Sequence, residues 1–313
     1  MSRSRGFSRT TGWRRCGSRC GVPAGRRLIP AAKLAEAASY DGGSLSITYG
    51  AGGDLVVVFQ RALEEDVFGT LEFAARVKRA GKAFGPLQVL GPSRGQSSIT
   101  TAVAEDGGAV VAWGTRDGGE LLGEGEGENA PWRVYAAALR PGAERFSGAR
   151  LLEPGFAIFP VSGVYAAAAP RGVATVAWSG SAPGTREFDH YPLHVATTGP
   201  DGRFAARARL ARDGAALGVV RAHDGTTTVL WGSQPDPDAG GLERILASRR
   251  PAGARDFAAA EQISPDGPST NGELALDPHS DRPAALWIGA RTRACYLEDE
   301  CPVQALFARL GGA

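Results

Sequence analysis

Short apolar runs recur along the chain at a regular interval, and each run carries an aromatic residue at the same place. The runs read DLVVVFQ, GAVVAWG, ATVAWSG, TTVLWGS and PAALWIG. Their aromatic residues are spaced by 54, 65, 53 and 56 positions, and these residues are Phe59, Trp113, Trp178, Trp231 and Trp287. Runs of this length, rich in Val, Ala, Thr and aromatics and bounded by Gly, Pro or Asp, are typical of β-strands. The pattern predicts five copies of one β-unit.

Each unit offers further strands around this central one. A run of small or alternating residues precedes it, as in SLSITYG and SGVYAAAAP, and another follows it, as in WRVYAAALR and ERILASRR. A turn that ends in a phenylalanine at 84, 146, 204 or 257 then leads into a last strand. We name the four strands A, B, C and D. Repeats of about 40 to 60 residues with four strands are typical of β-propeller blades, and an array of β-sandwiches is the alternative.

The two ends of the repeated region complement each other. Residues 28–37, LIPAAKLAEA, are similar to the D strands that begin at 84 and 204, whereas the fifth unit ends at FARLGGA without a D strand. We therefore predict an all-β fold over residues 28–313, a five-bladed β-propeller closed by an N-terminal strand that completes the last blade. The aromatic residue on each B strand is expected to pack between blades.

Residues 1–27 differ from the rest in charge. They hold eight Arg and no acidic residue, whereas the remainder carries 27 basic and 33 acidic groups. A basic arm on nucleic acid is one interpretation. We favour a disordered tail, because charged termini are commonly disordered. No apolar run of seven follows the arginines as in a signal peptide, and no stretch of 18 apolar residues is present to span a bilayer.

Four cysteines leave the redox compartment open. Cys295 and Cys301 bracket a short loop and are expected to form a disulfide, whereas the pairing of Cys16 and Cys20 is not determined. A disulfide implies an exported protein, so we expect an extracellular or cell-surface location. A zinc site is the alternative, but the spacing fits none of the usual zinc motifs.

The B–C loops are long and acidic. They cover 61–69, 114–131, 179–191, 232–242 and 288–301, and hold 15 of the 33 acidic residues against 5 Arg. Long variable loops on one face of a rigid scaffold are the usual place for binding residues. On this face the candidate ligand-binding residues are Glu187, Asp189, His190 and Arg94. A merely solvated acidic surface is the alternative.

One loop contains part of a calcium-binding pattern. In PDPDAGGLE, Asp236 and Asp238 place oxygens on alternate residues before a Gly pair. The bidentate Glu expected later is replaced by Ala247. We expect no cofactor, and calcium at this loop is the alternative.

The repeats resemble those of sialidase-like propellers. That family has an Asp-box turn between strands C and D, and Thr198, Asp201, Gly202 and Phe204 form one degenerate copy of it. The resemblance implies the propeller fold. For catalysis it also implies an arginine triad, a Tyr with a Glu partner and an acid/base Asp. Neither Tyr49 nor Tyr165 has an evident carboxylate partner in the sequence.

Other catalytic signals are thin. Arabinanase-like enzymes use two axial carboxylates, for which Asp41 and Glu273 are the candidates. GPSRG at 91–95 matches a nucleophile motif but leads into a strand, so we interpret it as a chance match. The four histidines, His190, His194, His223 and His279, are expected to be solvated loop residues.

These observations favour a non-catalytic binding or interaction module that takes a carbohydrate or protein ligand on the acidic B–C face. We expect a monomer that binds no nucleic acid and has no membrane span. A sialidase-like or arabinanase-like glycoside hydrolase is the alternative function.

Overall fold

A computed structural model describes most of the predicted strands. The described residues are 34–35, 44–63, 71–93, 98–116, 132–156, 163–180, 192–199, 201–233, 244–265, 269–277, 279–290 and 303–310. All of them belong to the compact unit Leu34–Ala313. The predicted tail, 1–27, lies outside the described residues.

The strands form five antiparallel sheets in chain order. Sheet 1 holds β1 (Leu45–Tyr49), β2 (Leu55–Ala62), β3 (Leu71–Lys78) and β4 (Gln88–Ser93). Sheet 2 holds β5 (Ser98–Val103), β6 (Ala109–Arg116), β7 (Trp132–Leu139) and β8 (Arg150–Phe156). Sheet 3 holds β9 (Tyr165–Ala169), β10 (Val173–Ser179), β11 (Leu193–Thr197) and β12 (Ala208–Ala211). Sheet 4 holds β13 (Ala215–Arg221), β14 (Thr227–Ser233), β15 (Arg244–Arg250) and β16 (Glu261–Gln262). Sheet 5 holds β17 (Ser269–Leu276), β18 (Pro283–Ala290) and β19 (Val303–Arg309).

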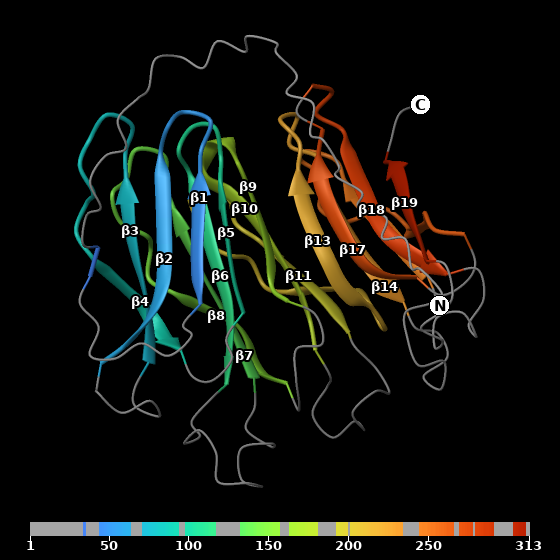
Figure 1. Cartoon of the computed structure of the whole chain (residues 1–313), viewed down its shortest axis with the longest axis horizontal. Coiled ribbons are helices and arrows are strands. Elements are labelled where there is room, and N and C mark those ends of the chain that lie inside the picture. Colours follow the sequence, from blue (N-terminus) through green and yellow to red (C-terminus); the bar gives the residue numbers. More distant parts are fainter. Residues whose placement is uncertain are drawn as a thin grey trace, which may run out of the picture. The chain divides into compact units, whose positions relative to one another are not determined.

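The prediction of an all-β chain built from five antiparallel sheets is confirmed. Within each sheet the strands pair in the order A, B, C, D, and the described part of sheet 5 stops at strand C, as expected. The one helical element described is a 3₁₀ turn, η1 (Pro170–Gly172). The A strands β1, β5, β9, β13 and β17 lie side by side in succession (Figure 1). They are therefore the inner strands.

The B-strand tryptophans join each sheet to the preceding one. Trp113, Trp178, Trp231 and Trp287 are at most 2% exposed. Trp178, for example, lies in one core cluster with Trp132 and Val134 of sheet 2. Burial of such large side chains is the main favourable term in packing sheet on sheet. Phe59 differs, because it belongs to the first sheet and is only partly buried.

The outward faces of the first and last sheets remain uncovered. Leu45, Ile47 and Tyr49 on β1 are 60 to 68% exposed, and Phe307 on β19 is 62% exposed. In the described residues the five sheets do not close into a ring. The predicted closing strand, 28–37, lies outside the described residues except for Leu34 and Ala35.

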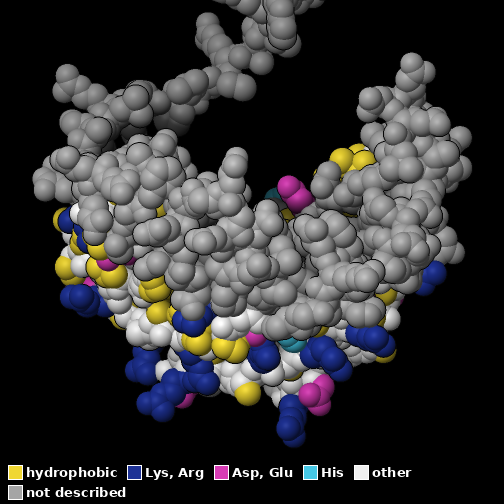
Figure 2. Space-filling view, turned by 90° about the horizontal axis from the view of Figure 1, so that it is seen from below, with side chains coloured by type: hydrophobic (Ala, Val, Ile, Leu, Met, Phe, Trp, Pro, Cys, Tyr) yellow, Lys and Arg dark blue, Asp and Glu magenta, His cyan; other side chains and the backbone are white. Residues whose placement is uncertain are grey.

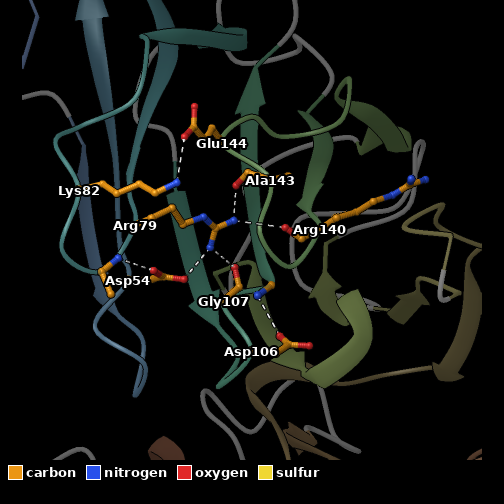
Figure 3. Close-up of polar contacts among 10 residues, drawn as sticks. Asp54, Arg79, Lys82, Asp106, Gly107, Arg140, Ala143 and Glu144 are labelled. Carbon is orange, nitrogen blue, oxygen red and sulfur yellow. Dashed lines mark hydrogen bonds and ion pairs between the residues drawn. The ribbon is translucent and has the colours of Figure 1, made fainter.

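Short turns at one end of the sheets are tied together by polar contacts. We call this end, where the A–B and C–D turns lie, the A–B end, and the opposite one the B–C end. Arg79 donates hydrogen bonds to Asp54 Oδ2 at 2.6 Å and to the carbonyl oxygen of Gly107 at 2.7 Å (Figure 3). It also reaches the carbonyl oxygens of Arg140 and Ala143. One guanidinium thus joins two turns of sheet 2 to sheet 1.

The turn of sheet 3 that resembles an Asp-box is held by side-chain hydrogen bonds. Thr198 Oγ1 accepts from the backbone N–H of Ala174 at 2.8 Å and donates to the carbonyl oxygen of Gly172 at 3.1 Å. Asp201 Oδ1 accepts from the N–H of Arg203, and the side chain of Phe204 is buried. The contacts made by these residues are structural.

Candidate functional site

Among the predicted catalytic, ligand-binding, metal and disulfide residues, Glu273 is the one that the structure describes. It lies on the inner strand β17 with an exposed side chain. The other candidates lie outside the described residues; they are Asp41, Arg94, Glu187, Asp189, His190, Asp236, Asp238, Cys295 and Cys301. Most of the B–C loops also lie outside them. On the described surface in Figure 2, Lys and Arg side chains predominate among the charged ones.

Tyr165 and Glu273 come within electrostatic range of each other. Tyr165 is the first residue of β9, so it lies at the B–C end of its strand, and β13 lies between β9 and β17. Strand β13 contains Gly218, and a Cβ added to this residue would lie 2.8 Å from Leu274 Cβ on β17. A glycine at this position therefore allows the close approach of the inner strands.

The phenol of Tyr165 is neutral at physiological pH. Its half-buried position, and then the charge of Glu273, raise its pKa above the ordinary value of 10.0. Tyr165 therefore retains its O–H as a hydrogen-bond donor, and Glu273 offers acceptor oxygens. The sequence placed these residues 108 positions apart, and no local motif relates them. Only the order of the inner strands brings them together.

His223 binds two carboxylates at the A–B end. Its Nε2 lies 2.6 Å from Glu105 Oε1, and its Nδ1 lies 2.8 Å from Asp281 Oδ1. Its backbone N–H also donates to Asp281 Oδ2 at 2.6 Å. Hydrogen bonds first from Glu105 and then from Asp281 raise the pKa of His223 to about 9. The side chain is exposed, as expected, but it is a charged link between turns of sheets 2, 4 and 5.

His194 overturns the expectation of a solvated loop residue. It lies on β11, its side chain is 12% exposed, and its ring packs beside Trp178 with a centroid separation of 5.8 Å. Its Nδ1 lies 3.5 Å from Glu153 Oε2, which is paired with Arg207. Because Arg207 neutralises that carboxylate, burial is the main influence on the protonation of His194. Burial, and then the charge of Arg209, lower the pKa of His194 to about 4.

The described residues contain no group of three or more His, Cys, Asp or Glu side chains arranged to ligate a metal. Within the same residues, no helix has the length and apolar character needed to cross a bilayer. The inner strands supply one arginine, Arg221, which lies at the A–B end of β13. The described part of these strands therefore assembles no arginine triad.

Comparison with known proteins gives distant structural similarities. No family model and no curated protein matches the sequence. A protein of unknown function from Dyadobacter fermentans is 15% identical with a TM-score of 0.47, covering 85% of this chain and 78% of its own. Polysaccharide lyase Uly1 is 10% identical with a TM-score of 0.49, and the match covers 85% of this chain. The NanB sialidase from Streptococcus pneumoniae is 7% identical with a TM-score of 0.43, and the match covers 90% of this chain.

The chain spans 58% of the length of the lyase and 60% of that of the sialidase. Because the three TM-scores are below 0.5, we draw no conclusion about activity from these similarities.

Proposed function

We propose that the protein is a non-catalytic binding module of the β-propeller type, which takes a carbohydrate ligand at the B–C end of its inner strands. The observation that carries this proposal is that Tyr165 and Glu273 lie on inner strands of the A series on either side of β13, within electrostatic range of each other. A neutral phenol and a carboxylate offer a donor and acceptors for sugar hydroxyls, and the aromatic ring offers a surface for the apolar face of a sugar.

The difference between the two ends of the sheets supports this location. At the A–B end, turns of neighbouring sheets are fixed by contacts such as that of Arg79 with Gly107 and that of Asp106 with the backbone N–H of Arg171. Such turns have little freedom to reshape around a ligand. Longer connections leave the sheets at the B–C end, where loop variation is compatible with a fixed scaffold.

The proposal includes closure of the five sheets into a ring. Closure would bury the exposed apolar residues on β1 and β19 between the first and last sheets. The four tryptophans are buried in the same way between the other neighbouring sheets. Residues 28–37 would complete sheet 5. Deletion of residues 1–38 is then expected to lower the unfolding temperature or to cause association. A soluble monomer of unchanged stability would refute closure by this segment.

One observation favours the alternative, a glycoside hydrolase. The sialidase resemblance implies a Tyr with a Glu partner, and Tyr165 with Glu273 is such a pair. A hydrolase would need Glu273 to act as the base that activates the phenol, because the pKa of Tyr165 is raised rather than lowered. The described inner strands offer no guanidinium at the B–C end to bind a carboxylate substrate.

Two assays on the same variants distinguish the functions. Binding to a glycan array is measured for the wild type, Tyr165→Phe and Glu273→Gln, with Lys82→Ala at the A–B end as the control. Hydrolysis of aryl sialosides and aryl arabinosides is measured in parallel. We expect glycan binding that both site variants weaken and the control retains, with no turnover. Turnover that Glu273→Gln abolishes would establish the hydrolase instead, and binding unchanged in both site variants would refute the site.

A further inference from the structure

Two arginines of sheet 4 lie opposite the same threonine. In the register of the sheet, Arg221 of β13 and Arg250 of β15 both pair with Thr227 of β14. Directly opposed residues in antiparallel strands point to the same face of the sheet. The row Arg221–Thr227–Arg250 therefore presents two guanidiniums on one face. Thr227 is fully buried and both arginines are half-buried.

Sheet 2 provides an internal comparison. In sheet 4 the central residue, Thr227, precedes the B-strand tryptophan by four positions. The residue four positions before the tryptophan of sheet 2 is Ala109, and its row is Val103–Ala109–Leu139. Ala109 and Leu139 are buried, and all three residues belong to one core cluster or pack against it. The repeated unit thus folds with an apolar row at this level, so the arginines of sheet 4 are not required by the fold.

The guanidiniums face hydroxyl groups of their own and the neighbouring sheet. Arg250 Nη2 donates to Thr197 Oγ1 of sheet 3 at 2.9 Å, and Arg221 Nη1 donates to Thr227 Oγ1 at 3.3 Å. Thr197 Oγ1 also lies 3.3 Å from Thr175 Oγ1, whose residue is fully buried. Arg250 stacks over the ring of Phe257 at 5.0 Å. These contacts fix the two arginines with neutral partners only.

Negative charge is scarce at this place. No described carboxylate lies within ion-pairing distance of either guanidinium, although Asp224 is near enough for its charge to act on Arg221. Burial, and then the charge of Arg250, lower the pKa of Arg221, and burial lowers that of Arg250. Arg221 Nε is buried without a hydrogen-bond partner. Two like charges in a half-buried site are unfavourable unless an anion lies between them.

We propose that Arg221 and Arg250 form an oxyanion-binding site for a sulfate or phosphate group at the interface of sheets 3 and 4. Guanidinium forks suit oxyanions because they donate parallel hydrogen bonds of fixed geometry. Gly225, in the A–B turn of sheet 4, lies beside the pair: a Cβ there would lie 3.3 Å from Arg221 Nη2. This site lies at the opposite end of the sheets from Tyr165 and does not rest on the proposed carbohydrate site.

The test is equilibrium dialysis with radiolabelled sulfate or phosphate at constant ionic strength, with labelled acetate as a third arm. Arg221→Val and Arg250→Leu reproduce the row of sheet 2, and the exposed Arg255→Ala is the control. We expect saturable binding of one sulfate or phosphate per chain, weaker by about tenfold or more in each site variant and unchanged in the control. Acetate is expected to bind more weakly than either dianion.

Unfolding temperatures in the same buffers supply a second readout. Without the anion, Arg221→Val and Arg250→Leu are expected to be at least as stable as the wild type, because each removes the repulsion between the guanidiniums. With the anion, only the wild type and the control gain stability. If Arg250→Leu does not fold, Arg250→Lys, which keeps the charge but loses the fork, takes its place with the same expected loss of affinity. Equal anion binding in the wild type and the site variants, or no saturable binding at all, overturns the proposal.

Discussion

Arg79 Nη1 lies 2.6 Å from Asp54 Oδ2, and the side chains are only 9% and 16% exposed. The carbonyl oxygens of Gly107, Arg140 and Ala143 accept the remaining hydrogen bonds of this guanidinium (Figure 3). Removing one member of such a pair leaves a buried charge without compensation. Arg79 thus joins two turns of sheet 2 to sheet 1 at the A–B end, beside the hydrogen bonds between Gln88 and Phe146.

Arg79→Leu is expected to lower the free energy of unfolding by about 3 kcal/mol, because Asp54 and three carbonyl groups lose their donor. Denaturant titration measures the loss. Lys82→Ala is the matched control, since Lys82 and Glu144 are 3.9 Å apart and 67% and 53% exposed. Exposed pairs contribute about 0.5 kcal/mol or less. Equal effects of the two variants would contradict the importance of Arg79.

Gly107→Ala separates steric contact from backbone strain. A Cβ at this residue would lie 2.1 Å from Asp54 Oδ2 and 2.6 Å from Arg79 Nη1, and φ is +78°. Gly142 has a similar φ of +75° and no atom within 4 Å of the added carbon. We expect about 1 kcal/mol of destabilisation in Gly142→Ala from strain alone, and clearly more in Gly107→Ala. Thermal unfolding of both variants tests this, and the prediction is wrong if they are equally stable.

Asp54 is expected to contribute to acid unfolding. Although burial opposes the shift, the backbone N–H of Ala80 and the guanidinium of Arg79 hold the pKa of Asp54 below its ordinary value of 3.8. A carboxyl with a lowered folded-state pKa stabilises the fold above its unfolded pKa, and this stability is lost as the pH falls through the folded pKa. Asp54→Asn should therefore lower stability at pH 7 and flatten its decline below about pH 4. A wild-type slope in the variant would exclude this role.

His223 is expected to make the stability of the protein fall as the pH rises into the alkaline range. Its pKa is raised to about 9, so the stability from its two ion pairs is complete below the unfolded pKa of 6.5 and is lost as the pH rises through about 9. In His223→Gln, the fall in unfolding temperature between pH 6 and pH 9.5 should be smaller than in the wild type. High salt should reduce the same difference, because the side chain is exposed. The exposed His279→Gln is the control and should keep the wild-type slope.

His194 is expected to make the stability of the protein fall as the pH drops into the acidic range. Its pKa of about 4 means that the folded protein keeps the ring neutral while the unfolded chain binds a proton near pH 6.5. Stability from this residue is complete above pH 6.5 and falls as the pH drops towards 4. His194→Gln should abolish that part of the pH dependence. NMR titration of the ring protons in the folded protein checks the cause directly, and a midpoint near 6.5 would contradict it.

The sequence predicted the five sheets because their strands are short apolar runs, and the spacing of the tryptophans is visible without coordinates. It also predicted strands A, B and C of the fifth unit, which are the three strands of that unit among the described residues. His194 was predicted wrongly as a solvated loop residue, because it lies on the strand β11 and its ring packs beside Trp178. The sequence gives only a weak indication of the contacts of Arg79, namely an arginine just before the C–D turn of the first unit. The partners of Arg79 lie in turns of sheets 1 and 2, which the sequence does not relate.

Pairs across inner strands could not be predicted in the same way. The approach of Tyr165 to Glu273 depends on which sheets are neighbours. It also depends on Gly218, whose missing side chain lets β13 and β17 lie close together. The row of Arg221 and Arg250 depends on the register of three strands, including a shift near Ala216. Local periodicity determines which face of a strand is buried, but it does not fix this register when polar residues occupy the buried face.

The replacement of an apolar row by Arg221, Thr227 and Arg250 in one sheet also indicates how such a chain acquires new chemistry. In a repeat protein each unit packs mainly against its neighbours, so an unfavourable substitution acts mainly at a single interface while the other units preserve cooperativity. Duplication supplies spare copies of the same surface. One copy can then diverge towards a ligand while its siblings keep the architecture intact.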